Sequence, residues 1–170
     1  MMMKLVYSLF LTICVACSVH AQKFGHINTS ALLEAMPEVK TADQLLAAFQ
    51  EGLIKGGETK AATFEADYKK YLEDVNNGVL SKVQQADREN ALAKAQQEIQ
   101  QYEQQVQLQV LQKREELLKP ILQKVDEAIK AEGKEGGYLF IFDSSVSGAL
   151  LFAQESDDLL SAVKKRLGIQ

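Results

Sequence analysis

Apolar side chains recur at helical intervals along most of this sequence, and the pattern is longest between Pro37 and Lys130. Phe64 and Tyr68 are four residues apart, and further along Leu111 and Leu118 are seven apart. Such intervals place side chains on one face of a helix. Alanine, glutamine, glutamate and lysine fill the positions between them, and these residues favour helix without needing burial. The pattern predicts long helices that share one narrow apolar seam.

The tripeptide Asn76-Asn77-Gly78 interrupts this helical pattern. Asparagine and glycine tolerate positive φ, which a reversal between antiparallel helices needs. We therefore predict a helical hairpin, an arm that spans residues 37–119 with its tip at residues 76–78. Opposed residue numbers would add up to roughly 154, so that Tyr71 meets Val83. At ~1.5 Å per residue each helix would be on the order of 55 Å long, and we expect such an arm to protrude from a compact body.

Three glycines, Gly52, Gly56 and Gly57, fall within the first helix of the predicted arm. Together they cost a helix roughly 2–3 kcal/mol relative to alanine. The predicted facing segment, residues 97–102, is rich in glutamine, so bulky side chains would be scarce on both helices at this height. One interpretation is a tolerated break in the helix. The other is a hinge that lets the distal part of the arm bend.

The C-terminal third changes from a helical period to short apolar runs. Residues 138–142 are a continuous apolar and aromatic run, which predicts a buried strand. Residues 149–152 follow a glycine turn and predict the second strand of a β-hairpin. A last helix, capped by Ser156 or Asp157, is predicted to run to Leu167.

The remaining elements complete a small body that we assign to residues 22–36 and 120–170. Lys23–Ile27 predicts a strand and Ala31–Ala35 a short helix, while Pro120 predicts a kink where the arm enters the body. A sheet of two or three short strands is marginal on its own, so several copies of the chain are expected to share one. The fold class predicted is mainly α with a small β-body.

Residues 1–21 have the features of a secretory signal peptide. Lys4 precedes a short apolar run, and small residues near its end predict cleavage after Ala21. Two alternatives remain. The segment could stay attached as an N-terminal anchor, or Cys17 could be lipidated, although Cys14 stands where lipidation signals usually carry an aliphatic residue.

The charge of the chain limits which partners it can bind, and its cysteine content limits what can stabilise it. Cys14 and Cys17 both lie in the predicted signal, so the exported protein enters an oxidising compartment without a disulfide. Packing or oligomerisation must then stabilise it. The full chain has a net charge of −4, and loss of Lys4 makes it more negative. An acidic protein argues against nucleic acid as a partner.

No residue pattern points to catalysis, a cofactor or a metal. After residue 21 the sequence holds one histidine, His26, and no cysteine, so metal-ligand spacing is absent. Phosphate-binding glycine loops and nucleophile motifs are also absent. We expect a protein that is not an enzyme.

The ordered motifs of the chain resemble the Skp/OmpH family of periplasmic chaperones. The motifs are the signal peptide, the strand at Lys23–Ile27, the polar hairpin, Leu118-Lys119-Pro120-Ile121-Leu122, Gly137 to Asp143, Ala149 to Ala153, and Asp158 to Gly168. The resemblance implies a homotrimer whose shared β-body carries three helical arms around a cavity for unfolded outer-membrane β-barrel proteins. Its trimer-core candidates here are Phe24, Ile27, Leu139, Ile141, Leu150, Phe152, Leu159 and Val163. Because family members that bind anionic partners are basic, the acidic chain argues against contact with lipid or lipopolysaccharide.

Two functions are consistent with these observations. The first is an ATP-independent holdase in the periplasm, and the second is a structural or adaptor coiled coil that binds a folded envelope partner. Sparse apolar residues on polar arms favour weak contact with many unfolded chains, whereas an adaptor would show one dense cluster. The candidates for contact with unfolded chains are Phe49, Leu53, Phe64, Tyr68, Tyr71, Ile99, Tyr102 and Val106. The competing interpretation is that they only form the seam between the two helices.

Overall fold

The computed structural model describes residues 22–169, so the predicted signal peptide and both cysteines lie outside the described part. The elements in chain order are β1 (Lys23–Ile27), α2 (Thr29–Ala35), α3 (Pro37–Asn76), α4 (Lys82–Glu135), β2 (Tyr138–Asp143), the 3-10 turn η1 (Glu155–Asp157) and α5 (Leu160–Leu167). The predicted fold class, mainly helical with long helices and a small sheet, is confirmed. The described residues divide into two compact units, one of residues 22–31 and 128–168 and one of residues 32–127.

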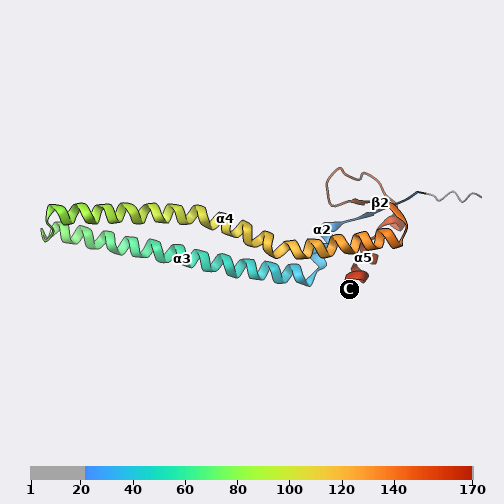
Figure 1. Ribbon diagram of the computed structural model, residues 1–170, viewed down its shortest axis with the longest axis horizontal. Coiled ribbons are helices and arrows are strands. Elements are labelled where there is room, and N and C mark those ends of the chain that lie inside the picture. Colours follow the sequence, from blue (N-terminus) through green and yellow to red (C-terminus); the bar gives the residue numbers. More distant parts are fainter. Residues whose placement is uncertain (1–21, 170) are drawn as a thin grey trace, which may run out of the picture. The chain divides into compact units, whose positions relative to one another are not determined.

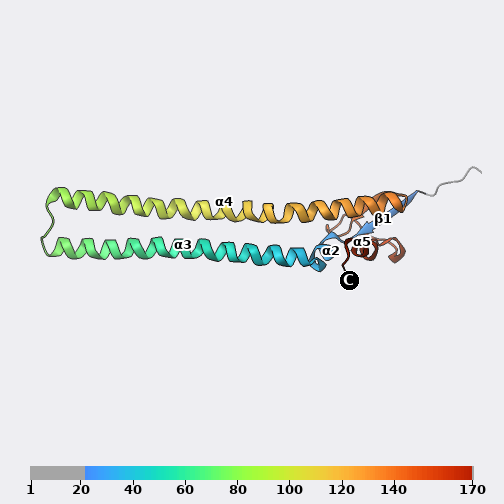
Figure 2. The same ribbon diagram turned by 60° about the horizontal axis from the view of Figure 1, so that its bottom comes forward.

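The larger unit is an antiparallel hairpin of α3 and α4, which lie side by side in both views (Figures 1 and 2). With 40 residues, α3 is about 60 Å long at the standard helical rise. Its first helical residue is Pro37, whose missing N–H costs nothing at that position. Burial is concentrated where the chain enters the hairpin, at Ala42 on α3 and at Ile121 and Val125 on α4. Residues 43–120 include no buried side chain, so the rest of the hairpin is a narrow seam.

The connection between α3 and α4 occupies residues 77–81. Gly78 takes φ +67° and its N–H donates to the Val75 carbonyl at 3.0 Å, which ends α3 with a glycine cap. Ser81 and Gln84 then cap each other at the start of α4. The Gln84 amide oxygen accepts from the Ser81 backbone N–H at 2.9 Å, and the Ser81 hydroxyl accepts from the Gln84 N–H at 3.3 Å.

The pairing of the two helices differs from the expected one. The Tyr71 hydroxyl donates to the Glu89 carboxylate, whereas Val83, the expected partner, is 71% exposed. The reason is the length of the connection. Because residues 77–81 all lie outside the helices, α4 begins later than a turn at residues 76–78 would allow, and each residue of α3 meets one further along α4.

Neither the glycines nor the proline interrupts a helix. α3 runs from Pro37 through Gly52, Gly56 and Gly57 to Asn76, so the predicted break is not present. Pro120 lies inside α4, which continues on both sides of it. Its side chain is exposed, and the carbonyl that loses its partner there can bond to water.

The smaller unit is built on a parallel pair of strands, β1 and β2, with Gly25 opposite Ile141 and Phe24 opposite Phe140. The predicted β-hairpin with residues 149–152 is wrong. Those residues lie in the loop between β2 and η1, and Phe152 is 82% exposed. A run of apolar residues predicts a strand only where another strand can pair with it. Here the segment at Asp158 takes the position beside β1, through a bridge to His26.

The core of the smaller unit is formed by Ile27, Ala128, Leu159 and Val163, all buried. Two glycines allow close approach: a side chain at Gly25 would meet Leu159 at 2.8 Å, and one at Gly133 would meet Ile141 at 2.8 Å. Ser156 and Asp157, predicted as caps of the last helix, lie in the 3-10 turn η1, and α5 begins at Leu160 with Leu159 as its N-cap residue. The Leu160 N–H donates to the Asp158 carboxylate at 2.8 Å.

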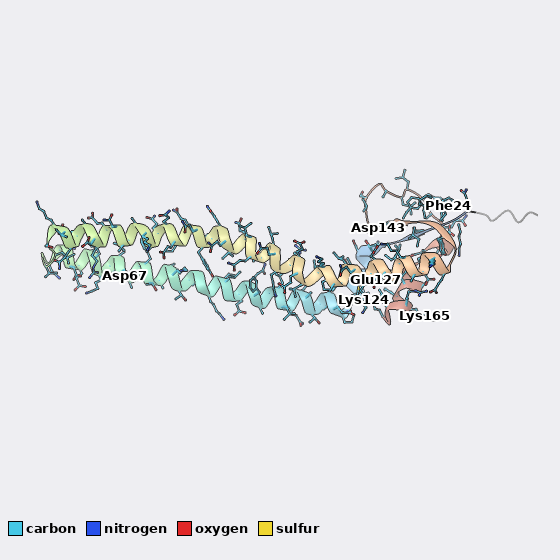
Figure 3. All side chains as sticks on the ribbon, in the orientation of Figure 1. Phe24, Asp67, Lys124, Glu127, Asp143 and Lys165 are labelled. Atoms are coloured by element: carbon cyan, nitrogen blue, oxygen red, sulfur yellow. The ribbon has the colours of Figure 1, made fainter. Side chains whose placement is uncertain are left out.

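Two polar clusters hold the elements of this unit together. Asp143, labelled in Figure 3, accepts from the Thr29 hydroxyl at 2.6 Å and from the Ser145 N–H at 2.9 Å. Arg166 on α5 pairs with Glu132 at 2.9 Å and with Glu135 at 2.5 Å on α4. Burial raises the pKa of Asp143, but the hydrogen bonds from Thr29 and Ser145 outweigh it and lower that pKa overall.

Candidate functional site

The seam of the hairpin contains most of the residues that the sequence marked for contact with unfolded chains. Half-buried positions on α4 recur at Leu92, Ala95, Ile99, Tyr102 and Val106, at intervals of three and four. The candidates that are half-buried in this way are Phe49, Leu53, Phe64, Tyr71, Ile99, Tyr102 and Val106. They pack between the helices and leave little surface free for a partner.

Tyr68 is the exception among these candidates. It is 46% exposed, and its ring stacks on Phe64 with centroids 6.2 Å apart and planes 10° apart. Phe64 belongs to a hollow between the helices that Ile99 also lines. Tyr68 therefore extends the seam outward and is the candidate that a partner could reach.

Tyr102 crosses the seam at the height of the three glycines. Its hydroxyl donates to the Leu53 backbone carbonyl at 2.8 Å. A side chain added at Gly56 would lie 2.5 Å from this hydroxyl oxygen, and one added at Gly57 would lie 3.4 Å from the ring. The expectation that bulk is scarce on both helices here is wrong, because the glycines make the space that the tyrosine ring fills. A side chain added at Gly52 would meet no atom within 4 Å, so this glycine takes no part in the contact.

Closer to the tip, polar groups replace apolar packing in the seam. The hydrogen bond from Tyr71 to Glu89, together with burial and the negative charge of Glu89, raises the pKa of Tyr71. Asp74 lies 4.0 Å from Arg88 and 3.8 Å from Lys70. At the other end of the hairpin, a bond from Lys124 to Glu38 at 2.5 Å lowers the pKa of that glutamate.

Large apolar residues outside the predicted contact set face solvent along the hairpin, and two of them, Val83 and Leu111, were expected in the seam. They are Leu45, Ile54, Leu72, Val79, Val83, Leu108, Leu111 and Leu122, each between 41% and 71% exposed. On α4, Leu111, Leu118 and Leu122 line an open hollow of about 560 Å³. Their spacing of seven and four puts them on one face of α4, and this face runs into the packed end of the seam, because Leu118 is half-buried and Val125, seven residues further along, is buried.

The residues predicted for a trimer core fall into two groups within the single chain. Ile27, Leu159 and Val163 are buried, and Ile141 and Leu150 are half-buried. The others are exposed, namely Phe24 at 44%, Leu139 at 54% and Phe152 at 82%.

The exposed group includes an aromatic row on one face of the sheet. Phe24 and Phe140 stack with centroids 6.1 Å apart, and Phe142 lies 6.3 Å beyond Phe140. Figure 3 labels Phe24 on β1. A hollow of about 150 Å³ adjoins this row and is lined by Phe142 and Phe152 among others.

Residues 22–169 lack two kinds of feature. No helix in this range is both long enough and apolar enough to cross a membrane. In the same residues, histidine, cysteine and carboxylate side chains do not gather in groups of three or more that could hold a metal ion.

Comparison with known proteins identifies the family. The sequence profile of the family described as "Outer membrane protein (OmpH-like)" matches residues 23–167. The chain belongs to this OmpH-like family. The match spans both strands, the hairpin and α5, so membership rests on the whole of the described fold.

Relatives of the OmpH-like chain include one named chaperone and one solved structure. The chaperone protein Skp of Yersinia enterocolitica is 26% identical over 167 residues, which are 94% of each chain. The crystal structure of a proposed OmpH-like outer membrane chaperone from Caulobacter crescentus superposes with a TM-score of 0.73. That match covers 86% of this chain and 83% of the other at 14% identity, which shows a shared fold.

Proposed function

We propose that this OmpH-like protein is an ATP-independent holdase chaperone that binds unfolded outer-membrane β-barrel proteins and keeps them from aggregating. The observation that carries the proposal is the long hairpin itself. The apolar seam between α3 and α4 covers a narrow strip of each helix. Apolar residues outside it, such as Leu108 and Leu111, are 60% and 63% exposed on an otherwise polar surface. Scattered apolar contacts of this kind suit many weakly bound partners better than one folded partner.

The protein acts as a homotrimer in this proposal, with arms that enclose a shared cavity. Support comes from the smaller unit, where Phe24, Phe140 and Phe142 expose aromatic surface on one sheet face. Within residues 22–169, no further strand pairs with the outer edge of β2. An exposed aromatic face and an unpaired edge are features that oligomerisation covers.

The site of action proposed is the periplasm. Residues 1–21 would direct export and be cleaved after Ala21, which leaves a chain without cysteine. Nucleic acid is not a partner in this proposal, and the net charge of −4 argues against lipid or lipopolysaccharide.

The test is a dilution assay. Residues 22–170 are mixed with a urea-denatured outer-membrane β-barrel protein, the urea is diluted, and light scattering is followed without nucleotide. We expect scattering to be suppressed once the chaperone trimer is in stoichiometric excess. Unchanged scattering, with binding to a folded envelope protein instead, would favour the adaptor function.

A further inference from the structure

A glutamine stands at the position that export would make the first residue of the protein. Cleavage after Ala21, the site predicted from the sequence, leaves Gln22 with a free α-amino group. Gln22 is exposed and lies outside β1, which begins at the next residue, Lys23. The strand pairing of β1 therefore does not hold the residue that would become the terminus.

The strand that follows Gln22 is anchored at its first residue. Lys23 pairs with Tyr138 of β2, and the Lys23 ammonium lies 3.9 Å from the centroid of the Tyr138 ring. The same ammonium donates to the Gly136 carbonyl at 3.2 Å. Ile27, at the other end of β1, is 1% exposed in the core of the smaller unit. A single residue thus separates the predicted terminus from a strand on which this core depends.

A glutamine at the start of a chain can react with its own α-amino group. At neutral pH a fraction of α-amino groups is uncharged, and the nitrogen of the neutral amine can attack Cδ, the carbon of the side-chain amide. A bond forms between the α-amino nitrogen and Cδ, and the bond from Cδ to the amide nitrogen breaks. The amide nitrogen leaves as ammonia with a proton from the amine. The product is a cyclic amide, pyroglutamate, and the reaction needs no oxidant, reductant or other reactant.

We propose that Gln22 becomes pyroglutamate in the exported protein and that this modification blocks the N-terminus directly in front of β1. The reaction involves atoms of Gln22 alone, and Gln22 is exposed, so the ring can form without opening the pairing of β1 with β2. This inference rests on the proposed export with cleavage after Ala21, and it is independent of what the hairpin binds.

The cyclic amide changes two properties of the N-terminus. The α-amino group loses its positive charge, so it no longer repels the neighbouring Lys23 ammonium, and the exported chain becomes more negative. Aminopeptidases cut next to a free α-amino group, which pyroglutamate does not offer. Stepwise removal of Gln22 and then of Lys23 is therefore prevented, and the strand that contributes Ile27 to the core stays complete.

The first experiment measures the modification where it would form. The protein is purified from the cells that naturally produce it, and its intact mass and N-terminal peptide are determined by mass spectrometry. We expect a chain that begins at Gln22 and is lighter by one ammonia. The matched control is Gln22→Ala, expressed in the same cells, which keeps the free amine at the same exposed position but has no side-chain amide. Its mass should be that of the cleaved chain without loss of ammonia.

The second experiment tests whether the fold leaves Gln22 accessible. Residues 22–170, released from a fusion with a free Gln22 amine, are folded and treated with a glutaminyl cyclase, beside a peptide of residues 22–26. We expect conversion of the folded protein within about tenfold of the rate for the peptide, since no strand has to open. The converted protein should then resist an aminopeptidase that removes residue 22 from the Gln22→Ala control.

Three results would overturn the inference. A natural chain that begins at Gln22 with its side-chain amide intact would refute the modification and leave the proposed export standing. A natural chain that keeps residues 1–21, or that begins at a lipidated Cys17, would refute cleavage after Ala21 and the modification with it. Conversion of the folded protein far more slowly than the peptide would show that the fold protects Gln22. None of these results touches the holdase function, which the dilution assay tests separately.

Discussion

Replacement of Gly56 by alanine tests whether the seam depends on the space that Tyr102 fills. In an exposed helix the change from glycine to alanine is favourable by about 1 kcal/mol. At Gly56, however, the new Cβ atom would lie 2.5 Å from the Tyr102 hydroxyl oxygen. The hydroxyl would have to move by about 1 Å to reach ordinary contact distance, which breaks its hydrogen bond to Leu53.

Loss of that hydrogen bond costs about 1 kcal/mol, and displacement of the ring adds to it. We therefore expect Gly56→Ala to be neutral or destabilising. The matched control is Gly52→Ala, one turn earlier on the same helix, where no atom lies within 4 Å and the full gain of about 1 kcal/mol should appear. The same substitution should thus differ by about 1–2 kcal/mol between two neighbouring turns.

A double-mutant cycle separates the hydroxyl from other causes. In Tyr102→Phe the nearest atom to a side chain at Gly56 is a ring carbon 3.4 Å away, so Gly56→Ala should become stabilising in that background. Urea unfolding followed by circular dichroism, at one fixed protein concentration, gives the free energies of unfolding of the wild type, the two single variants and the double variant. Equal stabilisation by Gly52→Ala and Gly56→Ala in the wild-type background would refute the reasoning.

Three further predictions concern other parts of the molecule. Asp143→Asn should destabilise the protein near neutral pH and make its stability less sensitive to acid. The lowered pKa of Asp143 contributes stability that is present above the ordinary pKa of 3.8 and is lost as pH falls below it. If unfolding midpoints of wild type and variant, measured from about pH 3 to 7, run parallel, this reasoning is wrong. Ile141→Asp should cost about 2–3 kcal/mol and dissociate the proposed trimer, since it puts a carboxylate against Gly133. A wild type that is monomeric in multi-angle light scattering would contradict the proposed trimer. Gln84→Ala should remove the reciprocal cap at Ser81, lower stability by about 1 kcal/mol and speed hydrogen exchange in the first turn of α4, an effect that Gln85→Ala should not reproduce.

The elements set by local sequence were predictable. Helical spacing indicated both long helices, Asn76 to Gly78 marked the end of the first, and the apolar run at residues 138–142 marked β2. The register of the hairpin was not predictable in this way, because it depends on how many residues the connection uses. The strand expected at residues 149–152 failed for a related reason: strand formation needs a partner, and a sequence pattern does not show which partner is available.

The contact between Tyr102 and the glycines could have been predicted from the sequence. The glutamines in residues 97–102 favour a weakly packed segment, but Tyr102 at the end of that segment supplies the bulk that packs against the glycines. Gly56 and Gly57 are adjacent, and a pair of glycines opposite one large aromatic residue is a sign of close packing as well as of flexibility. Whether residues 52–57 also act as a hinge stays a prediction, which hydrogen exchange across them can test.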